Sequence, residues 1–431
     1  MTLPRGMDVV SRAGRTRYTV VSLLGQGSQG SVHRVRPAGG GQDLALKWYT
    51  ATRSNEVQLE RIREVLRFER PSPNFLWPID LADGAEVRGF GYLMPLRGTG
   101  MRSLAEVLNG VAPMRLRAQC EAGARIADAF LRLHARGLCY ADISVSNAFV
   151  DPATGLVEIC DNDNVAIDGA DSAVLGTPYF MAPEILRGDA SPSSVTDRHS
   201  LAVILHMLLV RTHPLLGARE SATRILDMAS LHRLLGEEPV FLFDPDDESN
   251  RPSDEHDNAR VLWPALPAFA RRLFTAAFTE GLREPVHGRV TEGVWRSAFL
   301  RLRALVRTCP VCGAEQFFDE DEPTRPCAAL DCRATLDAPR RLIGRRAVVL
   351  EQDAAVHRSD LHPIDLDADE VVGTVISRPP TGALALWNRS DVVWTVDRAA
   401  GRTQVPPGSA VVARPGDRVR TGGAGSARFV E

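Results

Sequence analysis

The sequence predicts an α+β protein made of several domains. At roughly 150 residues per domain, a chain of 431 residues is too long for one. Residues 18–49 contain short β-branched runs separated by glycines, whereas residues 115–134 and 201–210 have the longer apolar patterns of helices. Residues 340–431 return to short strand-like runs with turn residues between them. We therefore expect a mixed α+β region followed by a smaller all-β domain.

Composition excludes several functional classes. Hydrophobic residues make up 44% of the chain and charged residues 24%, which is enough apolar material for sizeable cores. The net charge of −3 gives no basic footprint for nucleic acid or for an acidic membrane surface. The longest apolar run, Leu201–Val210, has about half of the ~20 residues that span a bilayer, and no secretory signal is visible. We expect a cytoplasmic protein that binds neither nucleic acid nor membrane.

A glycine-rich turn lies between two strand-like runs near the N-terminus. Residues 25–30 have the pattern Gly-x-Gly-x-x-Gly, which on its own also fits dinucleotide-binding folds. Those folds place a helix after the glycines, whereas Val32–Arg36 is alternating and β-branched, as in a returning strand. A glycine hairpin lets the backbone approach phosphates closely. We expect this turn to cover a nucleotide through Gly25, Gln26, Gly27, Gly30 and Val32.

The chain contains a single lysine. Lysine and arginine together number 51, and only Lys47 is a lysine. Because the chain uses arginine wherever any cation suffices, this position indicates chemistry that needs a compact ammonium group. The next helix-like segment carries Glu56, Glu60 and Glu64 at a spacing of four, near one face. Ala45-x-Lys47 after a glycine hairpin resembles the arrangement of protein kinases, which implies that a glutamate on the next helix holds the lysine. We expect this glutamate to be Glu60, although each of the three could instead be a solvated surface charge.

Three further motifs carry polar residues that suit phosphoryl transfer. Asp142 and Asn147 have the spacing Asp-x-x-x-x-Asn, and Asp161 follows the strand-like run Leu156–Cys160. Carboxylate and amide oxygens are ligands that Mg²⁺ accepts, and a carboxylate can also take a proton from a hydroxyl group. The string Gly176–Glu184, which reads Gly-Thr-Pro-Tyr-Phe-Met-Ala-Pro-Glu, is the most specific in the chain.

In this order the motifs resemble those of eukaryotic-type Ser/Thr protein kinases over about 300 residues. The resemblance implies a bilobal protein kinase-like fold, with an N-lobe over residues 1–97 and a C-lobe over residues 98–307. It implies ATP and Mg²⁺, with Lys47 on the phosphates, Asp142 on the acceptor hydroxyl, and Asn147 and Asp161 on the metal. Further ATP-binding residues would be Ala45, Met94, Pro95, Arg97 and Phe149, and structural residues would be Asp197, Glu184 and Arg289.

The sequence departs from the kinase pattern around the catalytic aspartate. Tyr140 and Ala141 replace the usual histidine and arginine, Ser144 replaces a lysine, and Asp161-Asn162-Asp163 replaces Asp-Phe-Gly. The missing arginine removes the usual pocket for a phosphorylated activation loop, and the missing lysine removes a cation at the γ-phosphate. An alternative is therefore a pseudokinase scaffold that binds nucleotide and recruits partners through its C-terminal modules. An active kinase is favoured because the chain retains Lys47, Asp142, Asn147 and Asp161.

A narrower resemblance concerns Glu60–Leu66, Leu76–Pro78, Gly89–Pro95 and the pair Asp161 and Asp163. These runs are similar to a bacterial kinase-like family associated with tellurite-resistance-type (TerY) phosphorylation systems. The resemblance implies a protein substrate, possibly a von Willebrand A-domain protein, in a system with a PPM-type phosphatase. A small-molecule kinase of the same fold is disfavoured because Gly176–Glu184 resembles a peptide-binding segment.

Four of the seven cysteines follow the kinase-like region within 24 residues. Cys309 and Cys312 form a Cys-x-x-Cys-Gly knuckle, and Cys327 and Cys332 form a second pair with a wider spacing. Two such pairs can complete a tetrahedral zinc site, and disulfides are the less favoured alternative in a cytoplasm. We expect a zinc-ribbon-like module over residues 308–338. The acidic segment Phe243–Asn258 is expected to be an exposed loop of the C-lobe.

The C-terminal residues 339–431 are expected to form a β-rich interaction domain, a sandwich or a barrel. Its strand-like runs are separated by turn signals such as Pro406-Pro407-Gly408. The run Val405–Val419 resembles the end of a forkhead-associated domain, but the residues with which that family reads phosphothreonine are not recognisable. We expect a docking module whose ligand the sequence does not give. The predicted strands are Ala347–Leu350, Glu370–Ile376, Ala383–Trp387, Val392–Val396 and Val411–Arg414.

Overall fold

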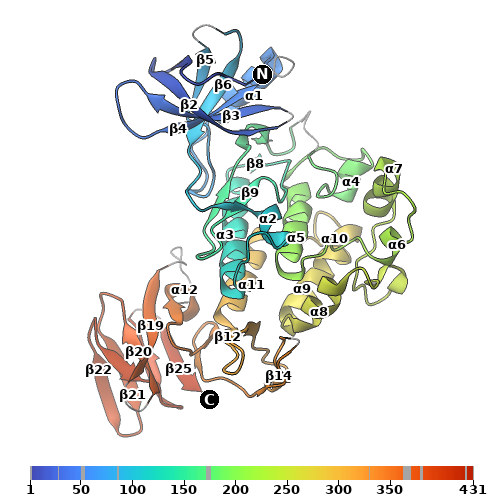
Figure 1. Ribbon diagram of the computed structural model, residues 1–431. Coiled ribbons are helices and arrows are strands. Elements are labelled where there is room, and N and C mark those ends of the chain that lie inside the picture. Colours follow the sequence, from blue (N-terminus) through green and yellow to red (C-terminus); the bar gives the residue numbers. More distant parts are fainter. Residues whose placement is uncertain are drawn as a thin grey trace. The chain divides into compact units, whose positions relative to one another are not determined.

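Figure 1 shows the helices and strands of the chain, which divides into two compact units. The first contains Met1–Met114, Ala122–Arg260 and Leu273–Arg296, and the second contains Arg115–Glu121, Val261–Arg272 and Ser297–Glu431. The computed structural model describes residues 2–27, 29–49, 54–84, 87–170, 176–329, 331–362, 370–378, 382–422 and 425–430. None of the helices in these ranges is long and apolar enough to cross a membrane.

The N-terminal part of the first unit is a closed barrel of six strands in the order β1-β2-β3-β4-β6-β5. Successive side chains of a strand point to opposite faces, so Leu46 and Trp48 pack in one core while Ala45 and Tyr49 pack in another. Lys47 lies between them in the chain and therefore shares the face of Ala45 and Tyr49. The strands are β1 (Asp8–Ser11), β2 (Arg17–Gln26), β3 (Gly30–Pro37), β4 (Leu44–Tyr49), β5 (Asp80–Gly84) and β6 (Phe90–Pro95).

One helix, α1 (Glu56–Val65), packs against this barrel. It begins after Asn55, whose side chain accepts a hydrogen bond from the backbone N–H of Gln58 at 3.0 Å, as a helix N-cap does. Its buried residues are Gln58, Leu59, Ile62 and Val65, which recur at helical spacing. The face of α1 that meets the barrel is therefore the face of Gln58 and Ile62.

The rest of the first unit is mainly helical and is organised around α5 (Ser194–Val210). This helix starts with a capping box between Ser193 and Thr196, and its apolar residues are buried almost all round, as in a core helix. Short strands carry the loops beside it. Strand β8 (Leu138–Cys139) ends before residues 140–147, and β10 (Val157–Ile159) ends just before Asp161.

The remaining elements up to residue 304 have the following bounds. The strands are β7 (Arg102–Ser103), β9 (Ala148–Val150) and β11 (Ala166–Ile167), which form the small sheets β10-β9-β7 and β11-β8. The α-helices are α2 (Leu104–Leu108), α3 (Leu116–His134), α4 (Pro183–Leu186), α6 (Ala218–Ser221), α7 (Met228–Leu231), α8 (Asp257–Ala265), α9 (Ala268–Phe278), α10 (Glu280–Arg283) and α11 (Glu292–Ala304). There are also two 3₁₀ helices, η1 (Asn162–Asn164) and η3 (Glu248–Asn250), and a π-helix, η2 (His232–Glu237).

The second unit contains two small hairpins that carry the clustered cysteines. Strands β12 (Val306–Thr308) and β13 (Glu315–Phe317) form one hairpin, and β14 (Arg325–Pro326) and β15 (Thr335–Leu336) form the other. Helix α11 stops at Ala304, because Val306 pairs with Phe317 in the first hairpin.

The C-terminal part of the second unit contains two antiparallel sheets with a common apolar core. Their orders are β17-β16-β25-β24-β21-β22 and β18-β19-β20-β23, and the fully buried Trp394 lies in the shared core. The strands are β16 (Arg341–Ile343), β17 (Ala347–Val349), β18 (Ala355–His357), β19 (Val371–Arg378), β20 (Ala383–Asn388), β21 (Trp394–Arg398), β22 (Gly401–Val405), β23 (Ala410–Val412), β24 (Arg418–Arg420) and β25 (Ser426–Val430), with the short helix α12 (Arg358–Leu361) after β18.

A buried ion pair ties helix α4 to a distant part of the first unit. Arg289 donates to both carboxylate oxygens of Glu184 at 2.7 and 2.8 Å, and its side chain is only 2% exposed. It also donates to the carbonyl oxygen of Val195 at the start of α5. The pair therefore holds the end of the Gly176–Glu184 segment against the helical core.

Replacement of Arg289 by alanine should lower the free energy of unfolding by about 3–5 kcal/mol, because it leaves Glu184 buried without its partner. The matched control is Arg260→Ala, since Arg260 pairs with the fully exposed Asp254 and should contribute less than about 1 kcal/mol. Urea titrations of both variants measure the difference. Equal losses would contradict this account of the pair.

Candidate functional site

A cavity of about 560 Å³ opens in the first unit, between the barrel and the loops that follow β8 and β10. Apolar side chains and backbone form much of its walls, and four charged residues line it: Lys47, Arg97, Asp142 and Asp161. All residues to which the sequence assigned an ATP-binding role lie in its lining: Gly25, Gln26, Gly27, Gly30, Val32, Ala45, Lys47, Met94, Pro95, Arg97 and Phe149. Leu24, Gln29, Leu76 and Cys160 line it too, and sequence reasoning missed them.

The glycine-rich turn forms one wall of the cavity. A Cβ atom at Gly30 would lie 2.1 Å from the carbonyl oxygen of Trp48, so only glycine allows β3 to approach β4 this closely. The backbone N–H of Gly27 donates to the carbonyl of Gly30 at 2.8 Å and closes the turn. Ser28, within the predicted motif, lies outside the described residues. Next to it, the side-chain oxygen of Gln29 accepts a hydrogen bond from Lys47 at 3.0 Å.

Lys47 is buried and makes its main ion pair with Asp163. Its Nζ lies 2.8 and 3.1 Å from the two carboxylate oxygens of Asp163, and 3.4 Å from Oδ1 of Asp161. The hydroxyl groups of Tyr49 and Tyr92 also donate to Asp163, at 2.6 and 3.0 Å. Asp163 is fully buried, so these donors replace the water that its carboxylate would otherwise bind.

The structure does not bring Glu60 to Lys47, which corrects the sequence prediction. The carboxylate of Glu60 pairs instead with Arg63 on the same helix, and the Glu60 side chain is 59% exposed. Two residues along an α-helix differ by about 200° in direction, so Glu60 points away when Gln58 faces the barrel. The amide of Gln58 donates to the hydroxyl oxygen of Tyr49 at 3.2 Å and to Asp163 at 3.3 Å. Helix α1 therefore contributes a neutral amide here.

Charge and burial act against each other in this cluster. Burial would lower the pKa of Lys47, but the charges of Asp163 and Asp161 raise it above its ordinary value. Burial would raise the pKa of Asp163, but the charge and hydrogen bonds of Lys47 lower it. Burial and the neighbouring Asp163 raise the pKa values of Tyr49 and Tyr92 well above the ordinary range. The cluster is therefore an ammonium–carboxylate pair held by two neutral phenols.

Asp142 lines the same cavity, and the side chains of two nearby residues hold its carboxylate by hydrogen bonds. Its Oδ1 accepts a hydrogen bond from the hydroxyl of Thr177 at 2.7 Å, and its Oδ2 accepts one from the amide of Asn147 at 3.1 Å. Burial raises the pKa of Asp142 above its ordinary value. A carboxylate fixed in this way can accept a proton from a hydroxyl group that enters the cavity.

Asp161 presents a partly exposed carboxylate to the cavity, with 35% of its side chain exposed. Its backbone is left-handed, with φ +55°, an unusual conformation for a residue other than glycine. The backbone N–H of Cys160, just before Asp161, donates to the carbonyl of Asn147 at 3.0 Å, which links the two loops. The oxygen atoms of Asn147 and Asp161 are of the kind that Mg²⁺ binds.

The residues that depart from the kinase pattern make contacts of their own. Asn162 donates from its amide to the carbonyls of Leu76 and Ile159 at 2.8 and 3.1 Å. The ring of Tyr140 packs edge-on against Phe130, and its hydroxyl donates to the carbonyl of Cys160. Hydrogen bonds thus replace part of the apolar packing expected there. Ser144 is buried, and its hydroxyl lies 3.1 Å from that of Ser146. Because a hydroxyl group is neutral, Ser144 cannot supply the positive charge of the lysine that it replaces.

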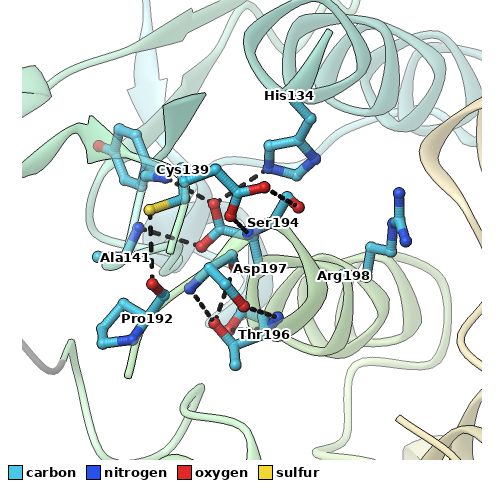
Figure 2. A network of polar contacts seen from close by, with 12 residues as sticks. His134, Cys139, Ala141, Pro192, Ser194, Thr196, Asp197 and Arg198 are labelled. Carbon is cyan, nitrogen blue, oxygen red and sulfur yellow. Dashed lines mark hydrogen bonds and ion pairs between the residues drawn. The ribbon is translucent and has the colours of Figure 1, made fainter. Parts of the chain in front are cut away.

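A buried polar network around Asp197 holds the backbone that leads to Asp142 (Figure 2). Asp197 on α5 accepts hydrogen bonds from the backbone N–H groups of Tyr140 and Ala141 at 2.6 and 3.0 Å. Nε2 of His134 lies 3.1 Å from the same carboxylate, and its Nδ1 lies 2.7 Å from Glu292. Burial alone would lower the pKa of His134, but hydrogen bonds to the two carboxylates raise it to about 9. The sequence singled out Asp197 but not His134 or Glu292.

The four clustered cysteines of the second unit converge on one point. Their Sγ atoms all lie within 4.8 Å of one another, with 3.8 Å between Cys309 and Cys332 and 3.6 Å between Cys312 and Cys327. All four are free thiols, so the structure does not contain the alternative disulfides. Backbone N–H groups of Cys312 and Val311 lower the pKa of Cys309 to about 6, whereas burial raises the pKa of Cys327 to about 12, so the metal-binding thiolate form is favoured at Cys309 alone of these two.

Comparisons with known proteins agree with this geometry. Residues 18–263, more than half of the chain, match the protein kinase domain family. The DNA damage-responsive serine/threonine-protein kinase RqkA of Deinococcus radiodurans is 27% identical over 47% of this chain and 31% of its own length. CBL-interacting protein kinase 4 of Oryza sativa subsp. japonica is 28% identical over 62% of this chain and 60% of its own length. Serine/threonine-protein kinase pkn3 of Myxococcus xanthus is 23% identical over 50% of this chain and 41% of its own length. The matched region thus spans less than two thirds of each relative.

The His134 network should make stability depend on pH. Because the pKa of His134 is raised from 6.5 to about 9 in the folded chain, its contribution is fully present below pH 6.5 and is lost as pH rises towards 9. The contribution is about 3 kcal/mol, since one pKa unit corresponds to about 1.4 kcal/mol. His134→Gln should remove this slope between pH 6.5 and 9, measured by urea unfolding. The control is the exposed His287→Gln, which should keep it. An unchanged slope in His134→Gln would contradict the assignment.

Proposed function

Because this chain belongs to the protein kinase family, we propose that it transfers the γ-phosphate of MgATP to a serine or threonine hydroxyl of a protein. The observation that carries the proposal is the convergence of Lys47, Asp142 and Asp161 on one nucleotide-sized cavity under a glycine-rich turn. These groups come from separate parts of the chain, and each supplies what phosphoryl transfer needs: a cation, a proton acceptor and a metal ligand.

Each residue has a defined role in this reaction. Lys47 binds the α- and β-phosphates, and Asn147 and Asp161 hold Mg²⁺, which would neutralise charge on the phosphate oxygens. Asp142 orients the acceptor hydroxyl and takes its proton while the oxygen forms a bond to the γ-phosphorus and the bond to ADP breaks. Thr177 and Asn147 support the role of Asp142, because their hydrogen bonds fix its carboxylate towards the cavity.

The adenine end of the cavity suits the base. The carbonyl of Pro95, the last residue of β6, and the N–H of Arg97 would contact the base, because proline keeps its carbonyl although it lacks the N–H group. The guanidinium of Arg97 lies over the ring of Phe149, 4.1 Å from the ring centre, and both residues line the cavity. Met94 lies buried at the back.

A second hypothesis is a pseudokinase scaffold that binds nucleotide without transferring phosphate. The observation in its favour is Ser144, which leaves the γ-phosphate without the usual lysine. The relatives, which are named as kinases, favour the active form. The two hypotheses differ in whether the γ-phosphate leaves ATP.

The partner is proposed from sequence resemblance. Similarity of the runs around Glu60–Leu66 and Leu76–Pro78 to a TerY-associated family supports a von Willebrand A-domain protein as the substrate, with a PPM-type phosphatase as the opposing enzyme. The segment Gly176–Glu184, held at its end by Arg289, supports a protein substrate. We place the reaction in the cytoplasm, where the free thiols of the seven cysteines would persist.

The second unit would supply a zinc module and a docking domain, over residues 308–338 and 339–431. Four Sγ atoms within 4.8 Å of one another fit a tetrahedral zinc site with Cys309, Cys312, Cys327 and Cys332 as ligands. Zinc would link the two short hairpins, whose small apolar cluster is built around the cysteines and Leu336. The sandwich beyond it offers exposed sheet faces on which a partner could dock.

The kinase proposal is tested by incubating the purified chain with Mg²⁺ and γ-labelled ATP, alone and with its neighbouring-gene products. We expect label on a protein. Lys47→Ala and Asp161→Ala should each lower transfer by about 10²-fold or more, because each removes a group that positions the phosphates. Nucleotide binding without transfer in every pairing would support the scaffold instead. A labelled metabolite without labelled protein would indicate a small-molecule kinase.

The zinc proposal predicts about one zinc per chain in the purified protein, measured by elemental analysis. Cys327→Ser should lose most of this metal, and the thermal transition of the second unit should move to lower temperature. Cys120→Ala removes a buried cysteine outside the cluster and should keep the zinc. Equal zinc contents in the two variants would rule out the site.

A further inference from the structure

We propose that Asp163 is the positioning residue of Lys47, a task for which the sequence suggested a glutamate on helix α1. The inference deepens the proposed function and rests on it, because it names the residue that sets the lysine in place for phosphate binding. Asp163 occupies the third position of Asp161-Asn162-Asp163, where the kinase pattern has glycine.

Among the described residues, Lys47 is the one cation that the carboxylate of Asp163 contacts. Both of its oxygens lie within 3.1 Å of Nζ, whereas the nearest oxygen of Asp161 is 3.4 Å away. Asp163 has no exposed surface and does not line the cavity, so it is not available to a metal ion or to a substrate hydroxyl. Its role is therefore to hold Lys47 and not to take part in the chemistry itself.

Three neutral donors fix Asp163 in turn. Oδ1 accepts from Tyr92, and Oδ2 accepts from Tyr49 and from the amide of Gln58. Tyr49 and Tyr92 come from β4 and β6, which are paired in the barrel, so the anchor is attached to the same sheet as Lys47. A buried carboxylate with its hydrogen bonds satisfied and one cationic partner is rigidly oriented.

This arrangement places the charged partner of Lys47 on the segment 161–163 and not on helix α1. In this chain α1 supplies the neutral amide of Gln58 to Asp163, while Glu60 is turned to solvent. The short 3₁₀ helix η1 (Asn162–Asn164) contains Asp163 and directly follows Asp161, so one segment positions both the lysine and the proposed metal ligand.

The test compares Asp163→Asn, Lys47→Met and the double variant with wild type, and uses Glu60→Gln as the matched control. Three quantities are measured on the full chain: the phosphotransfer rate, the affinity for MgATP, and the affinity for adenosine, which has no phosphates. Asp163→Asn should lower transfer by about 10²-fold, as a misplaced positioning group does. It should weaken MgATP binding by about tenfold and change adenosine affinity by less than about twofold, because Lys47 contacts phosphates only. Glu60→Gln should match wild type.

The double variant decides whether Asp163 acts through Lys47. If it does, Lys47→Met/Asp163→Asn should be no worse than Lys47→Met, because the anchor has nothing left to hold. The proposal would be overturned if the double variant lost the product of the two single losses in transfer rate. It would also be overturned if Asp163→Asn weakened adenosine binding as much as MgATP binding, or if Asp163→Asn behaved like wild type. If Asp163→Asn does not fold because Lys47 is left buried and unpaired, the comparison of Lys47→Met with the double variant still decides. If wild type binds MgATP without transferring phosphate, the proposed function fails while the binding measurements still test the anchor.

Discussion

The buried pair of Lys47 and Asp163 is the interaction on which the nucleotide site depends. Two charges withdrawn from water are unfavourable unless each finds a partner and hydrogen bonds, and here Tyr49, Tyr92 and Gln58 complete the shell. The barrel supplies the lysine and both tyrosines, and the turn after β10 supplies the carboxylate. The pair therefore joins the two sides of the cavity, and the protein uses its only lysine at this point.

A second buried network, in which charged groups are again paired and hydrogen-bonded, supports the loop of Asp142. Asp197 holds the backbone of Tyr140 and Ala141, and His134 bridges Asp197 to Glu292. This network holds the backbone just before Asp142, and Thr177 and Asn147 hold its carboxylate. Ala141 stands where the kinase pattern has an arginine, and among the described residues Asp197 and Thr177 hold this loop.

Much of the site could be predicted from sequence because its residues belong to ordered motifs with fixed spacing. Local sequence patterns predicted the glycine turn, Lys47, Asp142 and Asp161, because each lies in or directly after a strand-like or loop-like run. Glu60 was misassigned because three glutamates share one face of α1, and only packing against the barrel shows that Gln58 faces inward. Asp163 was noted as part of a motif, but its partner lies 116 residues away, and no local pattern gives that contact. In the C-terminal domain, the sequence did not predict β16, β18, β22, β24 and β25, which are only three to five residues long; arginines interrupt the apolar alternation in β16, β22, β24 and β25.

The most direct measurement is an experimental structure of the chain with Mg²⁺ and a non-hydrolysable ATP analogue. We expect Lys47 to contact the α- and β-phosphates while it remains paired with Asp163, with Gln29 displaced from Nζ by the nucleotide and Mg²⁺ bound by Asn147 and Asp161. A structure in which Lys47 leaves Asp163 and pairs with Glu60 of a rotated helix α1 would contradict the account.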